Sequence, residues 1–364
     1  MENKKTNILL IVVSIIVLMI VAIPIGFFMW YNSGLDAIDP NNSEKVSVEI
    51  VSGSGIAKIG QTLYEKNLIK DVNIFKIYVK LNNKTNLQAG TYEFAYDMSV
   101  SEMIDIMANG KIINNEVKIT FLEGKHMRWI AKKISETTNN TEQDVFDVLS
   151  DKEYINYLIE KYWFLTEEIQ DERIYYPLEG YLFPETYIFE SVDVDVKTIF
   201  ETMLNQTEKV INKYKDQIDQ RGLTVHQILT IASIVECEGI RDEDRSGIAS
   251  VIFNRIYKRM AIQSDVTTYY AIKVDMGERD LYKKELNTYN PYNTRGPDME
   301  GKIPVGPISS ISEASINATL NPLESEYIFF VADKNGKVYF TKNNTEHEKI
   351  IKQLKDQGLW YTYE

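Results

Sequence analysis

The sequence is poor in the residues that build disulfides and metal sites. It contains one cysteine, Cys237, and three histidines, His126, His226 and His347, in 364 residues. A single cysteine excludes an intramolecular disulfide and a zinc site built from several thiolates. Because the histidines are also scattered, we expect a protein that works without a metal or another cofactor.

An excess of positive charge is also missing. Lys and Arg number 40 against 53 Asp and Glu, so the formal net charge is -13. Sequence-independent nucleic-acid binding depends on Lys and Arg that neutralise phosphates, so nucleic acid is not an expected partner. The hydrophobic content of 44% and the charged content of 26% are those of a folded protein, and the length allows two folded units.

Charge is absent from one long stretch near the N-terminus. From Ile8 to Tyr31 the chain reads "ILLIVVSIIVLMIVAIPIGFFMWY", which is long enough to cross a hydrocarbon core of about 30 Å as a helix. A cleaved signal peptide would have a shorter apolar region of about 7 to 15 residues, followed by small residues. Here Phe27 to Tyr31 have the composition of an interfacial aromatic belt. The sequence therefore predicts an uncleaved, single-pass membrane anchor.

The charges around this segment predict its orientation. Lys4 and Lys5 precede it, and Asp36 and Asp39 follow it. By the positive-inside rule, residues 1–7 are a cytoplasmic tail and everything after the anchor lies outside the cytoplasm. Residues 32–45, "NSGLDAIDPNNSEK", have no apolar period and predict a linker.

The region after the linker mixes strand and helix patterns, which predicts an α+β fold. Val46, Val48 and Ile50 alternate as in a strand, and residues 56–63 have helical spacing. Farther along, "YYPLEGYLFPETYIF" combines aromatic residues, two prolines, Glu179 and Tyr181. Proline interrupts helices, so this run is either a rigid loop in the core or one wall of a carbohydrate groove.

The segment "TVHQILTIASIVECEG" predicts a buried helix. Thr224 and Gln227 form a capping box at its start, and Gly239 is placed to end it. Between these ends the helix is apolar on all sides, which indicates burial on all sides.

Glu236 stands at the end of this apolar helix and is the candidate catalytic residue. Non-polar surroundings and the negative end of the helix dipole both favour the protonated carboxyl group, which is the form a general acid needs. The alternative is a surface glutamate at a frayed helix end. Glu238 is a poor partner for Glu236, because side chains at i and i+2 of a helix point apart.

Seven motifs occur in one order behind the predicted anchor: "LEGYLFPETY", "LTIASIVECEG", "VIFNRI", "QSDVTTYYA", "NPYNTRG", "IPVGPISSISEASINATLNP" and "YIFFVADKNGKVYFTKNNTEHEK". Together they closely resemble the YceG-like (MltG) family of endolytic murein transglycosylases, over nearly the whole chain. The resemblance implies a small LysM-like subdomain at residues 46–112 and a larger mixed α+β catalytic domain at residues 113–364. It also implies an enzyme of the bacterial cell membrane that acts on peptidoglycan, with membrane-bound peptidoglycan synthases as expected neighbours.

Such enzymes cleave the bond between N-acetylmuramic acid and N-acetylglucosamine inside nascent strands and leave a 1,6-anhydro end. The family's catalytic glutamate in the "SIVE" motif corresponds to Glu236. It would protonate the leaving oxygen and then accept the proton of the sugar's own 6-hydroxyl. By resemblance and residue type, the residues expected to position the sugar are Gln263, Ser264, Asp265, Tyr292, Asn293 and Thr294, together with Glu179 and Tyr181.

Three features depart from the family pattern. Val266 stands where the family often has proline, Cys237 stands where it often has lysine, and the inserted "GPDMEGK" carries Asp298 and Glu300. Two other functions stay open. A two-carboxylate hydrolase would pair Glu236 with Asp265 or Glu179. A membrane-tethered protein that binds glycan without cleaving it is the second alternative.

Overall fold

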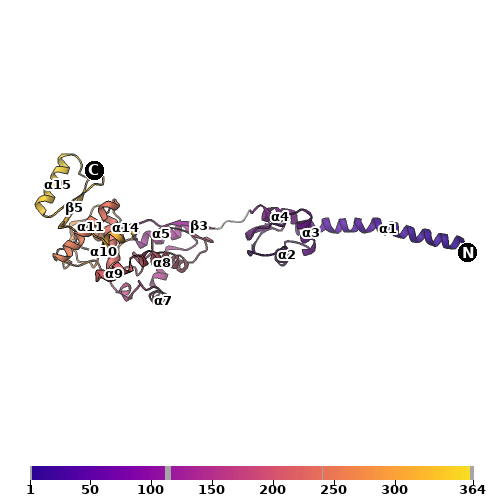
Figure 1. Ribbon diagram of the computed structural model, residues 1–364, viewed down its shortest axis with the longest axis horizontal. Coiled ribbons are helices and arrows are strands. Elements are labelled where there is room, and N and C mark those ends of the chain that lie inside the picture. The colour runs from indigo at the N-terminus through magenta and orange to yellow at the C-terminus, as the bar shows by residue number, and fades with distance from the viewer. Residues whose placement is uncertain (1, 111–115, 240, 361–364) are drawn as a thin grey trace. The chain divides into compact units, whose positions relative to one another are not determined.

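The computed structural model describes residues 2–110, 116–239 and 241–360 (Figure 1). The chain divides into two compact units, Met1–Asn115 and Glu116–Glu364. The described residues form helices and three two-stranded antiparallel sheets, so the expected α+β class is confirmed.

The first unit begins with a long apolar helix, α1 (Glu2–Leu35). Among the described residues it is the one helix long and apolar enough to cross a membrane, with a mean hydropathy of 1.5 over Leu18–Leu35. It runs past the predicted end at Tyr31, into the segment expected to be a linker. Its last turn packs on helix α3, where a side chain in place of Gly34 would overlap that of Ile74. This packing explains why the helix continues.

The rest of the first unit surrounds one antiparallel pair of strands. Its elements are β1 (Lys45–Ile50), α2 (Ile56–Glu65), α3 (Val72–Leu81), β2 (Gly90–Ala95) and α4 (Val100–Ala108). Val48 lies opposite Tyr92 in the sheet, and both are fully buried. Leu63, Phe75 and Met103 from the three helices complete the core, because their spacing puts one apolar face of each helix inward.

The second unit begins with a strand, three helices and the loop that contains the aromatic run. Its first eight elements, in chain order, are β3 (Val117–Thr120), α5 (Met127–Thr137), α6 (Glu142–Ser150), α7 (Lys152–Lys161), the 3-10 helix η1 (Glu167–Gln170), β4 (Thr186–Phe189), α8 (Val196–Asn212) and α9 (Lys215–Arg221). Strands β3 and β4 pair antiparallel. In the run before β4, Leu178 and Tyr181 are fully buried in the core, so the interpretation as a rigid core loop is confirmed.

Helix α10 (Val225–Glu238) is the central helix of the second unit, packed against α11 (Asp242–Tyr257) and α14 (Glu313–Leu320). The predicted capping box of Thr224 and Gln227 is confirmed, and Gly239 caps the other end. Residues 228–236 are all buried, as the apolar pattern predicts.

The remaining elements bring distant segments to the end of α10. They are α12 (Asp265–Ile272), α13 (Lys283–Leu286), the hairpin of β5 (Phe329–Ala332) and β6 (Val338–Thr341), and α15 (Asn344–Asp356). Helix α12 contacts α10, and β5 contacts α11. The last turn of α10 is therefore where a site can be built.

Candidate active site

The carboxyl group of Glu236 has polar and charged partners. Its Oε2 accepts hydrogen bonds from the backbone N–H of Ser312, at 2.9 Å, and from the Ser312 hydroxyl. Its Oε1 lies 3.1 Å from Nη2 of Arg245. Because these partners are polar or charged, the prediction of non-polar surroundings for this group is wrong.

The ion pair of Glu236 and Arg245 ties three helices together. Both side chains are less than 10% exposed, and Nη1 of Arg245 also donates to the Ser315 hydroxyl at 2.7 Å. The pair therefore joins α10 to α11 and to the start of α14. A buried carboxylate that is paired and hydrogen-bonded in this way suits a structural role better than proton donation.

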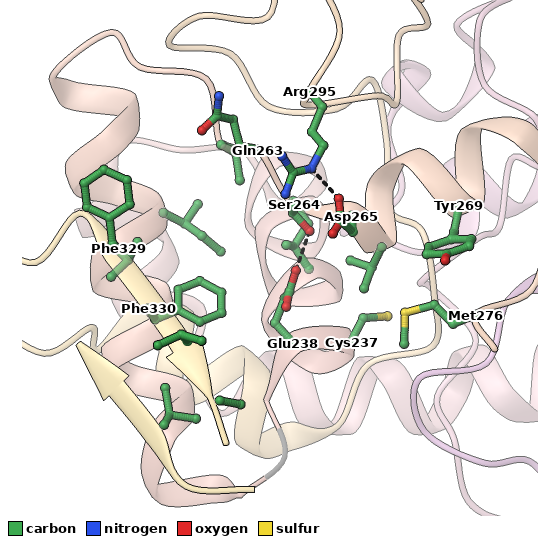
Figure 2. Close-up of a pocket in the computed structure, with 18 of the residues that line it drawn as sticks. Cys237, Glu238, Gln263, Ser264, Asp265, Tyr269, Met276, Arg295, Phe329 and Phe330 are labelled. Atoms are coloured by element: carbon green, nitrogen blue, oxygen red, sulfur yellow. Dashed lines mark hydrogen bonds and ion pairs between the residues drawn. The ribbon is translucent and has the colours of Figure 1, made fainter. Parts of the chain in front are cut away.

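Glu238 lines a pocket of about 970 Å³ (Figure 2). Burial raises the pKa of Glu238; the hydrogen bond from Ser264 opposes this shift, and the nearby charge of Asp265 adds to it. Sequence reasoning missed this residue as a candidate. The helical rule predicts that the side chains at positions 236 and 238 diverge, but it does not reveal that Glu238 lines a pocket.

The predicted residues Gln263, Ser264 and Asp265 line the same pocket. The Ser264 hydroxyl donates to Oε1 of Glu238 at 2.7 Å, and Asp265 forms an ion pair with Arg295 (Figure 2). Gln263 has a φ of +58°, a left-handed conformation that is uncommon outside glycine and that tends to occur at functional sites.

Asn293 and Thr294 lie beneath this segment. They are 2% and 0% exposed. The backbone N–H of Ser264 donates to the Thr294 hydroxyl at 3.0 Å, and the Thr268 hydroxyl donates to Oδ1 of Asn293 at 2.6 Å. Thr294 therefore holds Ser264, and Asn293 holds the N-terminal half of α12. The burial of both residues does not support the predicted contact with a sugar.

Tyr292, Glu179 and Tyr181 are also buried, with exposures of 0 to 1%. The Tyr292 hydroxyl accepts the backbone N–H of Tyr175 at 3.2 Å, and the Tyr181 hydroxyl is hydrogen-bonded to Nδ1 of His226 at 2.9 Å. Side chains packed in this way hold the core behind the site. Their burial likewise does not support direct substrate binding.

Glu179 is a buried carboxyl group that joins two elements near the site. Its oxygens accept the backbone N–H of Met127 at 3.0 and 2.9 Å and the hydroxyl of Tyr270 at 2.9 Å. Burial raises the pKa of Glu179 to about 7, although both sets of hydrogen bonds lower it. The folded protein thus keeps a proton that the unfolded chain releases at a lower pH.

We expect this group to make the stability of the second unit depend on pH. Because the folded pKa lies above the unfolded value of 4.5, the free energy of unfolding falls as the pH rises from about 4.5 to about 7, by roughly 3 kcal/mol. Urea unfolding of the full chain in detergent, compared with Glu179→Gln across this range, measures the effect. A difference between the two proteins that stays constant with pH would contradict it.

Several pocket residues come from distant segments that sequence reasoning did not connect. Phe329 and Phe330 belong to β5, Tyr269 to α12, and Met276 to the following loop (Figure 2). Arg295 directly follows the "NPYNT" residues, so its position in that motif was the one available signal. Within residues 2–110, 116–239 and 241–360, no group of three or more His, Cys, Asp or Glu is arranged to hold a metal ion.

Comparisons with known proteins agree on one family. The model of the YceG-like family matches residues 48–353. A Bacillus subtilis protein described as an endolytic murein transglycosylase is 34% identical over 325 residues, which cover 89% of each chain. A Streptococcus pneumoniae protein of the same description is 31% identical over 345 residues, which cover 90% of this chain and 62% of that protein.

A solved structure agrees as well. The crystal structure of a protein described as YceG-like, from Listeria monocytogenes, is 37% identical and superposes with a TM-score of 0.61. The superposition covers 85% of this chain and 99% of that chain. From the family match, the relatives and this structure, we conclude that the chain belongs to the YceG-like family.

Proposed function

We propose that the protein is a membrane-anchored endolytic lytic transglycosylase, which cleaves the bond between N-acetylmuramic acid and N-acetylglucosamine within peptidoglycan strands. Membership of the YceG-like family and the description of the relatives as endolytic murein transglycosylases support the reaction class. The pocket at the end of α10 supplies a carboxyl group that can give and take a proton.

The observation that carries the proposal is the position of Glu238, and we propose this residue as the acid in place of Glu236. Burial raises its pKa, which favours the protonated carboxyl group that a general acid needs, and its side chain lines the pocket. The Ser264 hydroxyl donates a hydrogen bond to Oε1 of Glu238 at 2.7 Å, and among the described residues no hydrogen bond to Oε2 is present. Oε2 is therefore the oxygen available to donate the proton.

The reaction then needs one carboxyl group and no water. Glu238 gives its proton to the glycosidic oxygen as the bond from that oxygen to C1 breaks. The 6-hydroxyl oxygen of the same muramic acid residue attacks C1, and its proton passes to the Glu238 carboxylate. The products are a new 4-hydroxyl end and a 1,6-anhydro end, and Glu238 is protonated again.

The neighbours of Glu238 position the sugar and balance charge. Asp265 carries a negative charge at the pocket, which stabilises the positive charge that develops at C1. Its ion pair with Arg295 fixes its position. Gln263 faces the same space with an amide that can both donate to and accept from sugar hydroxyls.

The rest of the chain fits an enzyme held at a membrane. We propose that α1 is a single-pass anchor with a cytoplasmic N-terminus and that the second unit acts outside the cytoplasm; the apolar window of α1 and the flanking charges support this topology. The strand-helix-helix-strand order of the first unit supports a LysM-like subdomain that binds glycan. Membrane-bound synthases are the proposed neighbours of an enzyme that acts on nascent strands.

Product analysis tests the reaction. Full-length protein in detergent is incubated with purified, uncrosslinked glycan strands, and the fragments are analysed by mass spectrometry. We expect muramic acid ends that are lighter than the hydrated ends by one water. A two-carboxylate hydrolase, in which Asp265 activates water beside Glu238, would give only hydrated ends and would overturn the proposed reaction. A protein that only binds glycan would give no fragments.

A further inference from the structure

A second pocket, of about 750 Å³, lies on other faces of the two helices that build the candidate active site. Helix α10 contributes Gln227 and Ile231 to it, whereas Ile234 and Glu238 of the same helix line the active-site pocket. Helix α11 contributes Tyr257, and the inserted segment contributes Asp298 and Lys302. The proposed reaction uses none of these residues. We propose that this second pocket is a second binding site for the glycan strand.

The charges of the second pocket are those of a site for a ligand with little net charge. Three acidic residues, Glu168, Asp171 and Asp298, and three basic residues, Arg173, Arg221 and Lys302, line it. The active-site pocket has the same balance, with three acidic and three arginine residues in its lining. A site for a polyanion would instead carry a positive excess. Sugar hydroxyls and acetamido groups are neutral donors and acceptors that suit such a mixed lining.

Two exposed tyrosines give the second pocket apolar faces for sugar rings. Tyr257 is 73% exposed and Tyr289 is 53% exposed, and both line the pocket. Tyr257 stacks on Phe253 at a centroid distance of 6.2 Å, and the Arg221 guanidinium lies 4.8 Å from the centre of the Phe253 ring. The Tyr257 ring is thus held in position before any ligand arrives, which lowers the entropic cost of binding.

The inserted segment forms an ordered wall of this pocket. Gly301 has a φ of +69°, and a β-carbon there would lie 3.1 Å from the Cα of Arg259, so the turn requires glycine. Its N–H donates to the carbonyl of Met260 at 3.0 Å. His226 fixes the end of the wall, with Nε2 hydrogen-bonded to the carbonyl of Val305 at 2.8 Å. The insertion, which the resemblance left without a role, therefore shapes this pocket.

A strand held at both pockets would stay on the enzyme more tightly than one held at the active site alone. Gln227 and Glu238 are 11 positions apart on one helix, or roughly 16 Å along its axis. Short oligosaccharides held at Glu238 would not reach the second pocket, whereas long strands would. The choice of glycan as the ligand rests on the proposed function. The existence of the site does not depend on whether the cleaved strand carries a 1,6-anhydro end or a hydrated end.

The test compares long and short glycans in two backgrounds. In Glu238→Gln protein, which we expect not to cut, the double variant Tyr257→Ala/Tyr289→Ala should bind long peptide-free strands about tenfold more weakly, and short oligomers of N-acetylglucosamine equally well. In protein that keeps Glu238, the same two substitutions should raise KM for long strands by about the same factor and leave kcat unchanged. Tyr157→Ala is the matched control, because Tyr157 is 45% exposed and lines neither pocket.

Three results would overturn the second site. The first is unchanged affinity of the double variant for long strands, and the second is an equal loss for long and short glycans, which would indicate damage to the active-site pocket. The third is competition by free stem peptide but not by peptide-free glycan, which would make this a peptide site. Because the binding measurements need no cleavage, hydrated products from the wild-type protein would refute the proposed reaction and leave the second site standing.

Discussion

Glu238→Gln should stop glycan cleavage by the full-length protein, lowering kcat by roughly a thousandfold. Glutamine keeps the size of the side chain and can still accept the hydrogen bond from Ser264, but it has no proton to give to the leaving oxygen. Since burial already disfavours the ionised form of Glu238, the neutral amide should fold as well as the wild type. The measurement is the initial rate of release of soluble fragments from uncrosslinked strands, with thermal unfolding recorded alongside.

The matched control is Glu236→Gln, two residues earlier on the same helix. This change should act on stability, and below the unfolding transition the folded fraction should keep a cleavage rate within about tenfold of the wild type, because the pocket groups remain. If Glu236→Gln lost cleavage at full stability while Glu238→Gln kept it, the family-based assignment to Glu236 would be right and the proposal for Glu238 would be wrong. Binding of glycan to both variants separates a loss of chemistry from a loss of substrate.

The helix that carries both glutamates could be predicted in detail from the sequence, but the environment of each glutamate could not. Local signals set the ends of α10, because Thr224, Gln227 and Gly239 cap the helix through contacts with residues only a few positions away. The partners of Glu236 are not local: Arg245 belongs to the next helix, and Ser312 lies 76 positions away. An apolar helix indicates burial, but it does not reveal a buried arginine at its end.

The dependence on distant partners also explains why only some of the predicted substrate-binding residues line the pocket. Gln263, Ser264 and Asp265 follow one another at the start of α12, and all three line the pocket. Other nominated residues, including Tyr292 and Glu179, also come from motifs, but a motif does not distinguish a side chain that touches the ligand from one packed behind it. That distinction depends on tertiary contacts, such as those of Glu179 with Met127 and Tyr270.

Chain organisation was more predictable than side-chain environment. The apolar helix at the N-terminus follows from composition alone, and the two units divide after Asn115, close to the expected boundary at residues 112 and 113. The end of α1 was placed too early, because the sequence around Gly34 has the composition of a linker. Its packing against Ile74 depends on a helix that begins 37 residues after α1 ends.

The largest expected loss of stability is that of Glu236→Gln. The change removes the buried one of two carboxylates paired with the Arg245 guanidinium, whose side chain is 8% exposed. The remaining partner is Asp242, which is 80% exposed and whose Oδ1 lies 3.0 Å from Nε. Removing one partner of a buried ion pair typically costs about 3 to 5 kcal/mol, and the solvent-exposed Asp242 compensates the buried guanidinium only weakly. For a unit of this size we expect the melting temperature to fall by about 10 °C, measured by calorimetry on the full chain in detergent.

A second substitution shows whether the buried charge that has lost its Glu236 partner is the cause. Arg245→Met in the Glu236→Gln background removes the buried guanidinium and keeps much of its volume, so the double variant should regain at least about half of the lost stability. Additive losses from the two changes would mean that Arg245 contributes through its packing and its bond to Ser315 rather than through Glu236. In that event the pair would not be what fixes the last turn of α10, and the position of Glu238 in the pocket would have to depend on Ser264 and its supporting threonine instead.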